Sequence, residues 1–164
     1  MILPTLSAAD TTSYDAWIKE DVGHSAREIS LVLATNATAY HVGDSILLQV
    51  GLRDDGMAPL TVTSRTPWHG SKLIITDQAG QQVVPTHDTD PSDFLTMHFL
   101  DLKPGKTVYL GFMLRTWNDI SSWGYTLTKP GIYKIVGIPL VNGAYVADDD
   151  TTIRSNVVTI TILP

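Results

Sequence analysis

The feature that most constrains this chain is the alternation of apolar and polar side chains near its C-terminus. Val158, Ile160 and Ile162 alternate there with Thr159 and Thr161. A side-chain period of two is that of a β-strand with one buried face, because successive Cβ atoms point to opposite faces of a sheet. The same signal recurs in other short runs, at residues 28–35, 45–55, 59–65, 72–77, 81–85, 94–100 and 107–115. The sequence therefore predicts an all-β chain of about eight or nine short strands.

The longer runs also predict which side chains face the core. These inward residues are Ile29, Leu31 and Leu33, then Ile46, Leu48, Val50 and Leu52, and then Val108, Leu110, Phe112 and Leu114. Turn residues separate the runs. Pro104-Gly105 and Pro130-Gly131 suit type II turns, and Asn142-Gly143 suits a type I′ hairpin, because glycine accepts the positive φ that these turns need. Short strands joined in this way are typical of a two-sheet Greek-key sandwich.

Tyr133 follows the turn at Pro130-Gly131 and precedes the apolar run from Ile135 to Val141. In Greek-key sandwiches a tyrosine near the start of a late strand packs its ring into the end of the core. Its hydroxyl then bonds to the main chain a few residues upstream. We therefore predict that Tyr133 is a structural anchor at a corner between the sheets rather than a ligand contact.

Composition supports the same fold class. Charged residues make up 17% of the chain, below the roughly 25% of average globular proteins. Of the 17 acidic residues only Glu20 and Glu28 are glutamate, so the other 15 are aspartate. Glutamate fills helix surfaces whereas aspartate closes turns, and the chain is therefore predicted to hold little helix.

The charge pattern and the absence of known catalytic motifs limit the classes of function that we expect. The net charge is −6 and the eleven Lys and Arg residues are scattered, so the chain would repel a phosphate backbone and no nucleic-acid partner is expected. No apolar run approaches the roughly 18 to 20 residues of a membrane span, so no membrane insertion is expected. The sequence holds no cysteine, no G-x-S-x-G, no H-E-x-x-H and no phosphate loop. We therefore expect neither an enzyme nor, apart from calcium, a cofactor.

Residues 1–25 lack the alternation seen in the rest of the chain. They are predicted to form an N-terminal arm, irregular or with a short helix from Asp15 to Glu20 that Ser13 would cap. Residues 26–164 are the predicted sandwich domain. The first ten residues lack the basic and long apolar regions of an intact signal peptide. A chain without cysteine fits either redox compartment, and we favour a secreted or periplasmic location over a cytoplasmic one. The oligomeric state stays open.

Five segments give the chain a resemblance to bacterial immunoglobulin-like sandwich domains. They read TAYHVGDSILLQVGLRDDGMAPLTV, DQAGQQVV, LDLKPGKTVYLGFML, LTKPGIYKIV and SNVVTITI. Their arrangement is similar to that of the intracellular proteinase inhibitor family and of many extracellular accessory modules. The resemblance covers about residues 28–163 and implies an immunoglobulin-like Greek-key sandwich. An inhibitor would need an extended loop that fits a protease cleft, and the candidates are Val84–Phe94 and Trp117–Tyr125.

Two segments, TPWHG and TWNDISSWGY, are more aromatic than a minimal sandwich domain needs. Exposed Trp and Tyr in loops are typical of recognition surfaces, and such rings can also stack on sugars. The alternative is that the rings fold back over the ends of the core, because Trp is mostly buried in proteins. The candidate ligand-binding residues are Trp68, His69, Trp117, Asn118, Asp119, Trp123 and Tyr125.

Two aspartate-rich segments are candidates for a calcium site, because Ca²⁺ takes many oxygen ligands. They supply Asp88, Asp90 and Asp93 in one segment and Asp148, Asp149 and Asp150 in the other. Two such loops at one end of a sandwich could share a cation. The EF-hand pattern is absent, and the alternative is that these aspartates form solvated turns.

These observations predict a non-catalytic binding module that presents loops to a protein or polysaccharide partner. Two alternatives stay open. One is a proteinase inhibitor, which rests on the family resemblance. The other is a carbohydrate-binding module that uses Trp68, Trp117 and Trp123.

Overall fold

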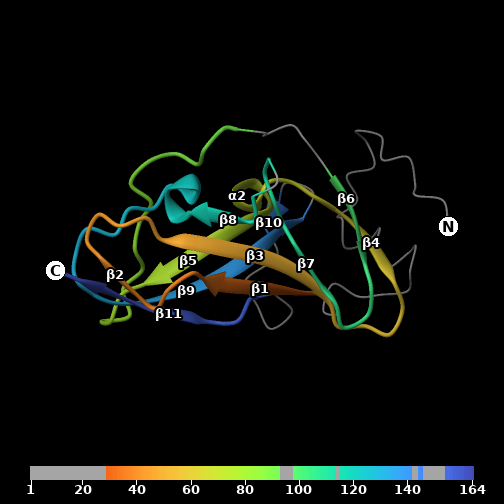
Figure 1. Cartoon of the computed structure of the whole chain (residues 1–164), viewed down its shortest axis with the longest axis horizontal. Helices are drawn as coiled ribbons and strands as arrows, with labels where there is room; N and C mark the ends of the chain where they lie inside the picture. The colour runs from red at the N-terminus through yellow and green to blue at the C-terminus, as the bar shows by residue number, and fades with distance from the viewer. Residues whose placement is uncertain (1–28, 93–97, 114, 142–143, 146–153) are drawn as a thin grey trace.

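In the computed structural model of this chain, the strands form two main sheets and one small two-stranded ribbon (Figure 1). The structure describes residues 29–92, 98–113, 115–141, 144–145 and 154–164. The predicted N-terminal arm, residues 1–25, lies outside this range, so its boundary stays a prediction.

The first sheet is built around β3 (Leu47–Asp54), which pairs antiparallel with β1 (Ile29–Thr35) along one edge. Two short strands share the other edge of β3. They are β7 (Thr107–Tyr109), which lies along its second half, and β8 (Trp117–Asp119), which lies along its first half. The pairing of β8 with β3 positions the candidate functional site described below.

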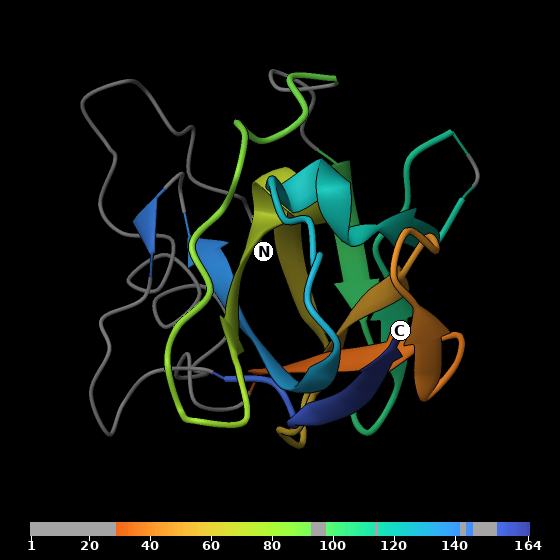
Figure 2. The ribbon, with the colours of Figure 1, turned by 90° about the vertical axis from the view of Figure 1, so that its left-hand side faces the viewer.

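The second sheet is built around β9 (Gly131–Val141) and β11 (Val158–Leu163), which pair antiparallel. The other edge of β9 carries β5 (Ser71–Thr76), and β2 (Ala39–His41) lies parallel to β11. The two-residue strand β10 (Ala144–Tyr145) pairs antiparallel with the end of β9, with Ala144 opposite Val141. Figure 2 shows the two sheets as separate layers.

The remaining elements lie around the edges of the sandwich. Strands β4 (Leu60–Ser64) and β6 (His98–Leu102) form an antiparallel ribbon. Two single helical turns, α2 (Pro67–Gly70) and η2 (Ile120–Trp123), lie near each other in the upper half of Figure 1. No helix in the described ranges is long and apolar enough to cross a membrane.

The core confirms the inward faces predicted for the longer runs. The inward residues of β1, Leu31 and Leu33, pack in one buried cluster with those of β3, Leu48 and Val50. Side chains of β5, β9 and β11 complete this cluster from the other sheet. The largest fully buried residues of these five strands are Leu31, Leu48, Val50, Leu73, Ile75, Ile135, Ile160 and Ile162. The predicted all-β, two-sheet immunoglobulin-like sandwich is confirmed.

The tyrosine corner is also confirmed. The hydroxyl of Tyr133 donates a hydrogen bond of 2.8 Å to the carbonyl oxygen of Lys129, and the ring is buried. Gly131, between the two residues, has a φ of 152°, which is a left-handed conformation that favours glycine. Burial raises the pKa of the Tyr133 hydroxyl, so the group stays protonated and able to donate.

Replacing Tyr133 with phenylalanine is expected to lower the free energy of unfolding by about 1 kcal/mol, because the Lys129 carbonyl loses its donor. Urea denaturation measures this loss. Tyr109→Phe is the matched control, because the hydroxyl of this exposed residue forms no hydrogen bond within the described part of the chain. Equal losses in the two variants would contradict the anchoring role of Tyr133.

One predicted strand, residues 107–115, is wrong in its extent. Strand β7 ends at Tyr109, and the chain turns back between Phe112 and Arg115, whose backbone groups bond each other at 2.8 and 2.9 Å. Met113 in this turn has a φ of 48°. After the turn the chain returns to β3 as β8. The predicted strand is therefore β7 followed by a turn, and β8 continues along the same edge of β3 just beyond it. Of the predicted inward residues, Leu110 is buried and Phe112 half-buried, and Leu114 lies outside the described residues.

The predicted strand at residues 81–85 is a single bridge between Thr76 and Gln82, followed by one bond from the Val83 amide to the Ile75 carbonyl. The described residues hold eleven strands rather than the predicted eight or nine. The additional ones, β2, β8 and β10, have three residues or fewer, too few to show an alternation in the sequence.

Candidate functional site

The aromatic residues of the two long segments cover one end of the core. Trp68, Trp123 and Tyr125 are 4%, 5% and 4% exposed. The ring of Trp68 meets those of Trp123 and Phe112 edge to face, with centroid distances of 6.4 and 5.3 Å. The interpretation of these rings as plugs is confirmed. The alternative of an exposed sugar-stacking face built from Trp68, Trp117 and Trp123 is wrong, because two of the three rings are buried.

The polar atoms of these aromatic side chains form hydrogen bonds with β5 along the edge that does not pair with β9. The Tyr125 hydroxyl donates to the Leu73 carbonyl at 2.8 Å, and the Trp123 indole nitrogen donates to the Ser71 hydroxyl at 3.2 Å. An exposed edge strand can pair with another chain. The aromatic segment therefore supplies hydrogen-bond partners to this edge of β5. The same bonds fix the position of η2 against the sandwich.

Three other predicted ligand-binding residues are not brought together. Trp117 is 37% exposed and lies on the outer face of β8, opposite Gln49. Asn118 is buried, and its side-chain nitrogen has no partner within the described part of the chain. His69 is buried, and its Nδ1 lies 2.9 Å from the Thr66 hydroxyl. Both partners of this contact are buried, Thr66 fully.

Residues 84–92, here named the braced loop, are exposed but firmly held. Val84 is 74% exposed. The backbone amides of Thr86 and His87 donate to the Gly124 carbonyl at 2.8 and 3.3 Å, and the Asp90 amide donates to the Ser122 carbonyl at 3.0 Å. Figure 2 shows this segment, in light green, curving past η2. Backbone bonds at several points therefore fix the shape of an exposed loop.

Side chains add two further bonds to the braced loop. The Trp68 indole nitrogen donates to the Asp90 carbonyl at 2.9 Å, and His87 Nε2 lies 2.9 Å from the Ser121 carbonyl oxygen. Gly124 makes the close approach possible. Its φ is 93°, and a Cβ on it would overlap the carbonyl oxygen of His87.

Two of the predicted calcium ligands lie on the braced loop. The Asp90 carboxylate accepts a 2.8 Å bond from the Ser92 amide, and hydrogen bonds from Ser92 lower the pKa of Asp90. No group of three or more potential metal ligands occurs among the described residues. Asp88 is exposed on the same loop. The remaining predicted ligands, Asp93, Asp148, Asp149 and Asp150, lie outside the described residues, so the shared calcium site stays a prediction.

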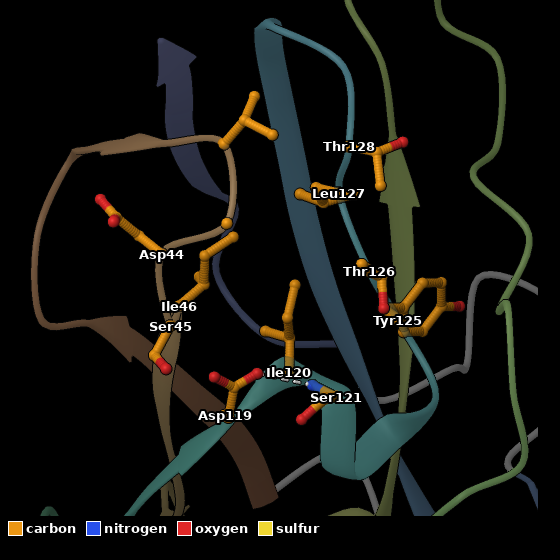
Figure 3. A pocket seen from close by; sticks show the side chains of 12 residues that line it. Asp44, Ser45, Ile46, Asp119, Ile120, Ser121, Tyr125, Thr126, Leu127 and Thr128 are labelled. Carbon is orange, nitrogen blue, oxygen red and sulfur yellow. Dashed lines mark hydrogen bonds between the residues drawn. The ribbon is translucent and has the colours of Figure 1, made fainter. Parts of the chain in front are cut away.

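A pocket of about 270 Å³ lies beside η2 (Figure 3). Three segments form it, residues 42–46 between β2 and β3, residues 119–121, and residues 125–128 before the tyrosine corner. Ile46, Ile120 and Leu127 are its buried apolar residues. The polar lining residues are Asp44, Ser45, Asp119, Ser121, Thr126 and Thr128.

Both carboxylates of the pocket also hold the local backbone. Asp119 Oδ1 accepts a 2.9 Å bond from the Ser121 amide at the start of η2, while its second oxygen forms no bond within the described residues. Asp44 Oδ2 accepts a 2.8 Å bond from the His41 amide. The described lining residues include no lysine, arginine or histidine, so the pocket favours neutral or cationic groups.

Of the predicted ligand-binding residues, Asp119 and Tyr125 line the pocket. Two contributing segments, residues 42–46 and residues 126–128, were not predicted from the sequence. Val42-Gly43-Asp44 was recognisable only as a turn, because no local signal shows that it lies against η2.

No known protein family matches the chain, and no curated protein is similar to it in sequence. The CARDB domain of a Pyrococcus furiosus protein in complex with di-metal ions is 12% identical with a TM-score of 0.39, over 82% of this chain and 87% of that one. A Pseudomonas fluorescens alkylpurine DNA glycosylase bound to DNA containing an abasic site analog is 14% identical with a TM-score of 0.42, over 84% and 31% of the chains. A Bacillus subtilis sporulation control protein is 9% identical with a TM-score of 0.41, over 84% and 50%. These structures are distantly similar, and the fold assignment above rests on the strand pairing of this chain.

Proposed function

We propose that this chain is a non-catalytic binding module that holds a protein partner at the loop end formed by the braced loop and the pocket beside η2. The observation that carries the proposal is the combination of exposure and anchoring in the braced loop. Its residues 84–89 are exposed. The amides of Thr86 and His87 bond the Gly124 carbonyl, the Asp90 amide bonds the Ser122 carbonyl, and the His87 side chain contacts the Ser121 carbonyl. A loop fixed before binding loses little conformational entropy on binding, which favours affinity.

The pocket supports the same proposal. Protein interfaces obtain much of their affinity from a few side chains that fill well-packed pockets. Ser121 lines the pocket, and its carbonyl oxygen lies 2.9 Å from His87 Nε2 of the braced loop. A partner that contacts the loop is therefore placed to insert one side chain into the pocket.

Selection from a randomised peptide library tests this function. We expect enriched peptides whose affinity falls at least about tenfold when Val84 is replaced with aspartate, because a charge would enter the contact. Val157→Asp is the matched control, because Val157 is also exposed, at 57%, but precedes β11 and belongs neither to the braced loop nor to the pocket lining. Failure to enrich any sequence, or binding that ignores Val84→Asp, would overturn the proposal.

A proteinase inhibitor is the second candidate function, and the braced loop favours it specifically. A loop that enters a protease cleft resists cleavage when its backbone is held on both sides. The predicted loop Val84–Phe94 contains the braced loop, whereas the other candidate, Trp117–Tyr125, is folded into β8 and η2. Assays with subtilisin-like and trypsin-like proteases should show inhibition by the wild type and cleavage of Gly124→Ala. Ordinary digestion of the wild type would remove this candidate.

A further inference from the structure

We infer that the pocket beside η2 binds the side chain of a lysine or arginine carried by the protein partner. The inference rests on the proposed function, which it extends by naming the chemical class of the contact. It combines three properties of the pocket, namely its apolar floor, its carboxylates and its size.

The apolar floor suits the stem of a long basic side chain. Ile46, Ile120 and Leu127 are 4%, 2% and 6% exposed, and all three line the pocket. Figure 3 shows Ile120 and Leu127 on facing sides of the hollow. Lysine and arginine bury their methylene stems on apolar surface while the charged group stays near water.

The carboxylates suit the charged group. Asp119 has one oxygen engaged with the Ser121 amide and one without a bond within the described residues. Asp44 adds a second carboxylate, whose Oδ2 lies 3.8 Å from His41 Nδ1 outside the pocket lining. The described lining residues themselves hold no lysine, arginine or histidine. The net charge of −6 adds a field of the same sign. A cation is therefore attracted, and an anionic group is repelled.

Backbone oxygens can complete the contact. Among the described residues, Thr126, Leu127 and Thr128 form no backbone–backbone hydrogen bond, although all three line the pocket. Their carbonyl groups can accept from an ammonium or a guanidinium, which have only donors. A volume of about 270 Å³ lies below the usual range of drug-sized ligand sites, so it suits one side chain.

An NMR titration of the full chain with small probes tests the inference. The probes are Nα-acetyl-lysine methylamide, Nα-acetyl-arginine methylamide and the neutral analogue Nα-acetyl-norleucine methylamide. We expect the amides of Ser45, Ser121 and Thr126 to shift with a Kd on the order of 1 mM for the basic probes, weakening as salt rises. The norleucine probe should bind at least about tenfold more weakly.

Charge-removing variants locate the contact. Asp119→Asn and Asp44→Asn each keep a side-chain oxygen for the backbone bond that the carboxylate now accepts. Each is expected to weaken the basic probes about threefold, and the double variant about tenfold. Asp101→Asn is the matched control, because this carboxylate bonds the Thr61 hydroxyl on the β4–β6 ribbon. Equal binding of the neutral probe, equal weakening by Asp101→Asn, or no shift at the pocket amides would overturn the inference.

The peptide selection separates this inference from the proposed function. Enriched peptides that depend on Val84 but contain no required lysine or arginine would leave the binding module standing and overturn the basic contact. Two results together would support both the proposed function and the inference. The wild type should lose binding when one basic residue of an enriched peptide is replaced with norleucine, whereas the affinity of the Asp119→Asn variant should not change with that replacement.

Discussion

Replacing Trp123 with alanine is expected to lower the free energy of unfolding by about 3 to 5 kcal/mol. The ring is 5% exposed and packs edge to face against Trp68, and its indole nitrogen bonds Ser71. Its removal leaves a cavity at the end of the core and frees η2. Urea denaturation followed by circular dichroism gives the loss.

Trp117→Ala is the control for this prediction. Trp117 lies six residues earlier in the same aromatic segment but is 37% exposed on the outer face of β8. Its replacement should cost less than about 1 kcal/mol. If the two variants lost equal stability, the assignment of Trp123 as a core plug would be wrong.

Gly124→Ala is expected to lower the free energy of unfolding by about 3 kcal/mol. Part of the loss, about 1 to 2 kcal/mol, is the cost of a non-glycine residue at a φ of 93°. The rest arises because the new Cβ would overlap the His87 carbonyl oxygen, so the braced loop must move away and lose bonds worth about 1 kcal/mol each. Urea denaturation gives the total, and faster proteolysis within residues 84–92 would report the released loop.

Gly80→Ala separates the two contributions to this loss. Gly80 also has a positive φ, 79°, but a Cβ added to it would meet no atom within 4 Å. It should therefore show the backbone cost alone, about 1 to 2 kcal/mol. A loss in Gly124→Ala no larger than that in Gly80→Ala, with the loop still protected from proteases, would show that the loop does not depend on the close approach at Gly124.

The sequence predicted features whose partners are close along the chain. The alternation assigned Leu31, Leu48 and Ile160 to the core, because a period of two leaves each side chain one of two faces. The corner at Tyr133 was predictable because its hydroxyl bonds Lys129, only four residues earlier. The run at 107–115 was predicted as one strand because its alternation continues through a turn. The structure shows that this turn lies between β7 and β8, which both pair with β3.

Exposure of the aromatic rings could not be predicted from their neighbours in sequence. Trp117 and Trp123 lie in one segment with similar flanking residues, yet one ring faces solvent and the other closes the core. Burial of Trp123 depends on Ser71 and Trp68, which are far away in the chain. Local sequence is compatible with both outcomes, and packing against distant segments decides between them.

By itself, therefore, the sequence determined the all-β class, the sandwich architecture, the inward faces and the tyrosine corner, because periodicity and turn chemistry are local properties. Only the tertiary structure decided which aspartates line the pocket and which aromatic rings are buried. The pairing of β8 with β3 brings η2 beside residues 42–46, and Gly124 admits the close approach of the braced loop. These contacts join segments far apart in the chain, and local side-chain pattern does not encode which distant segments meet.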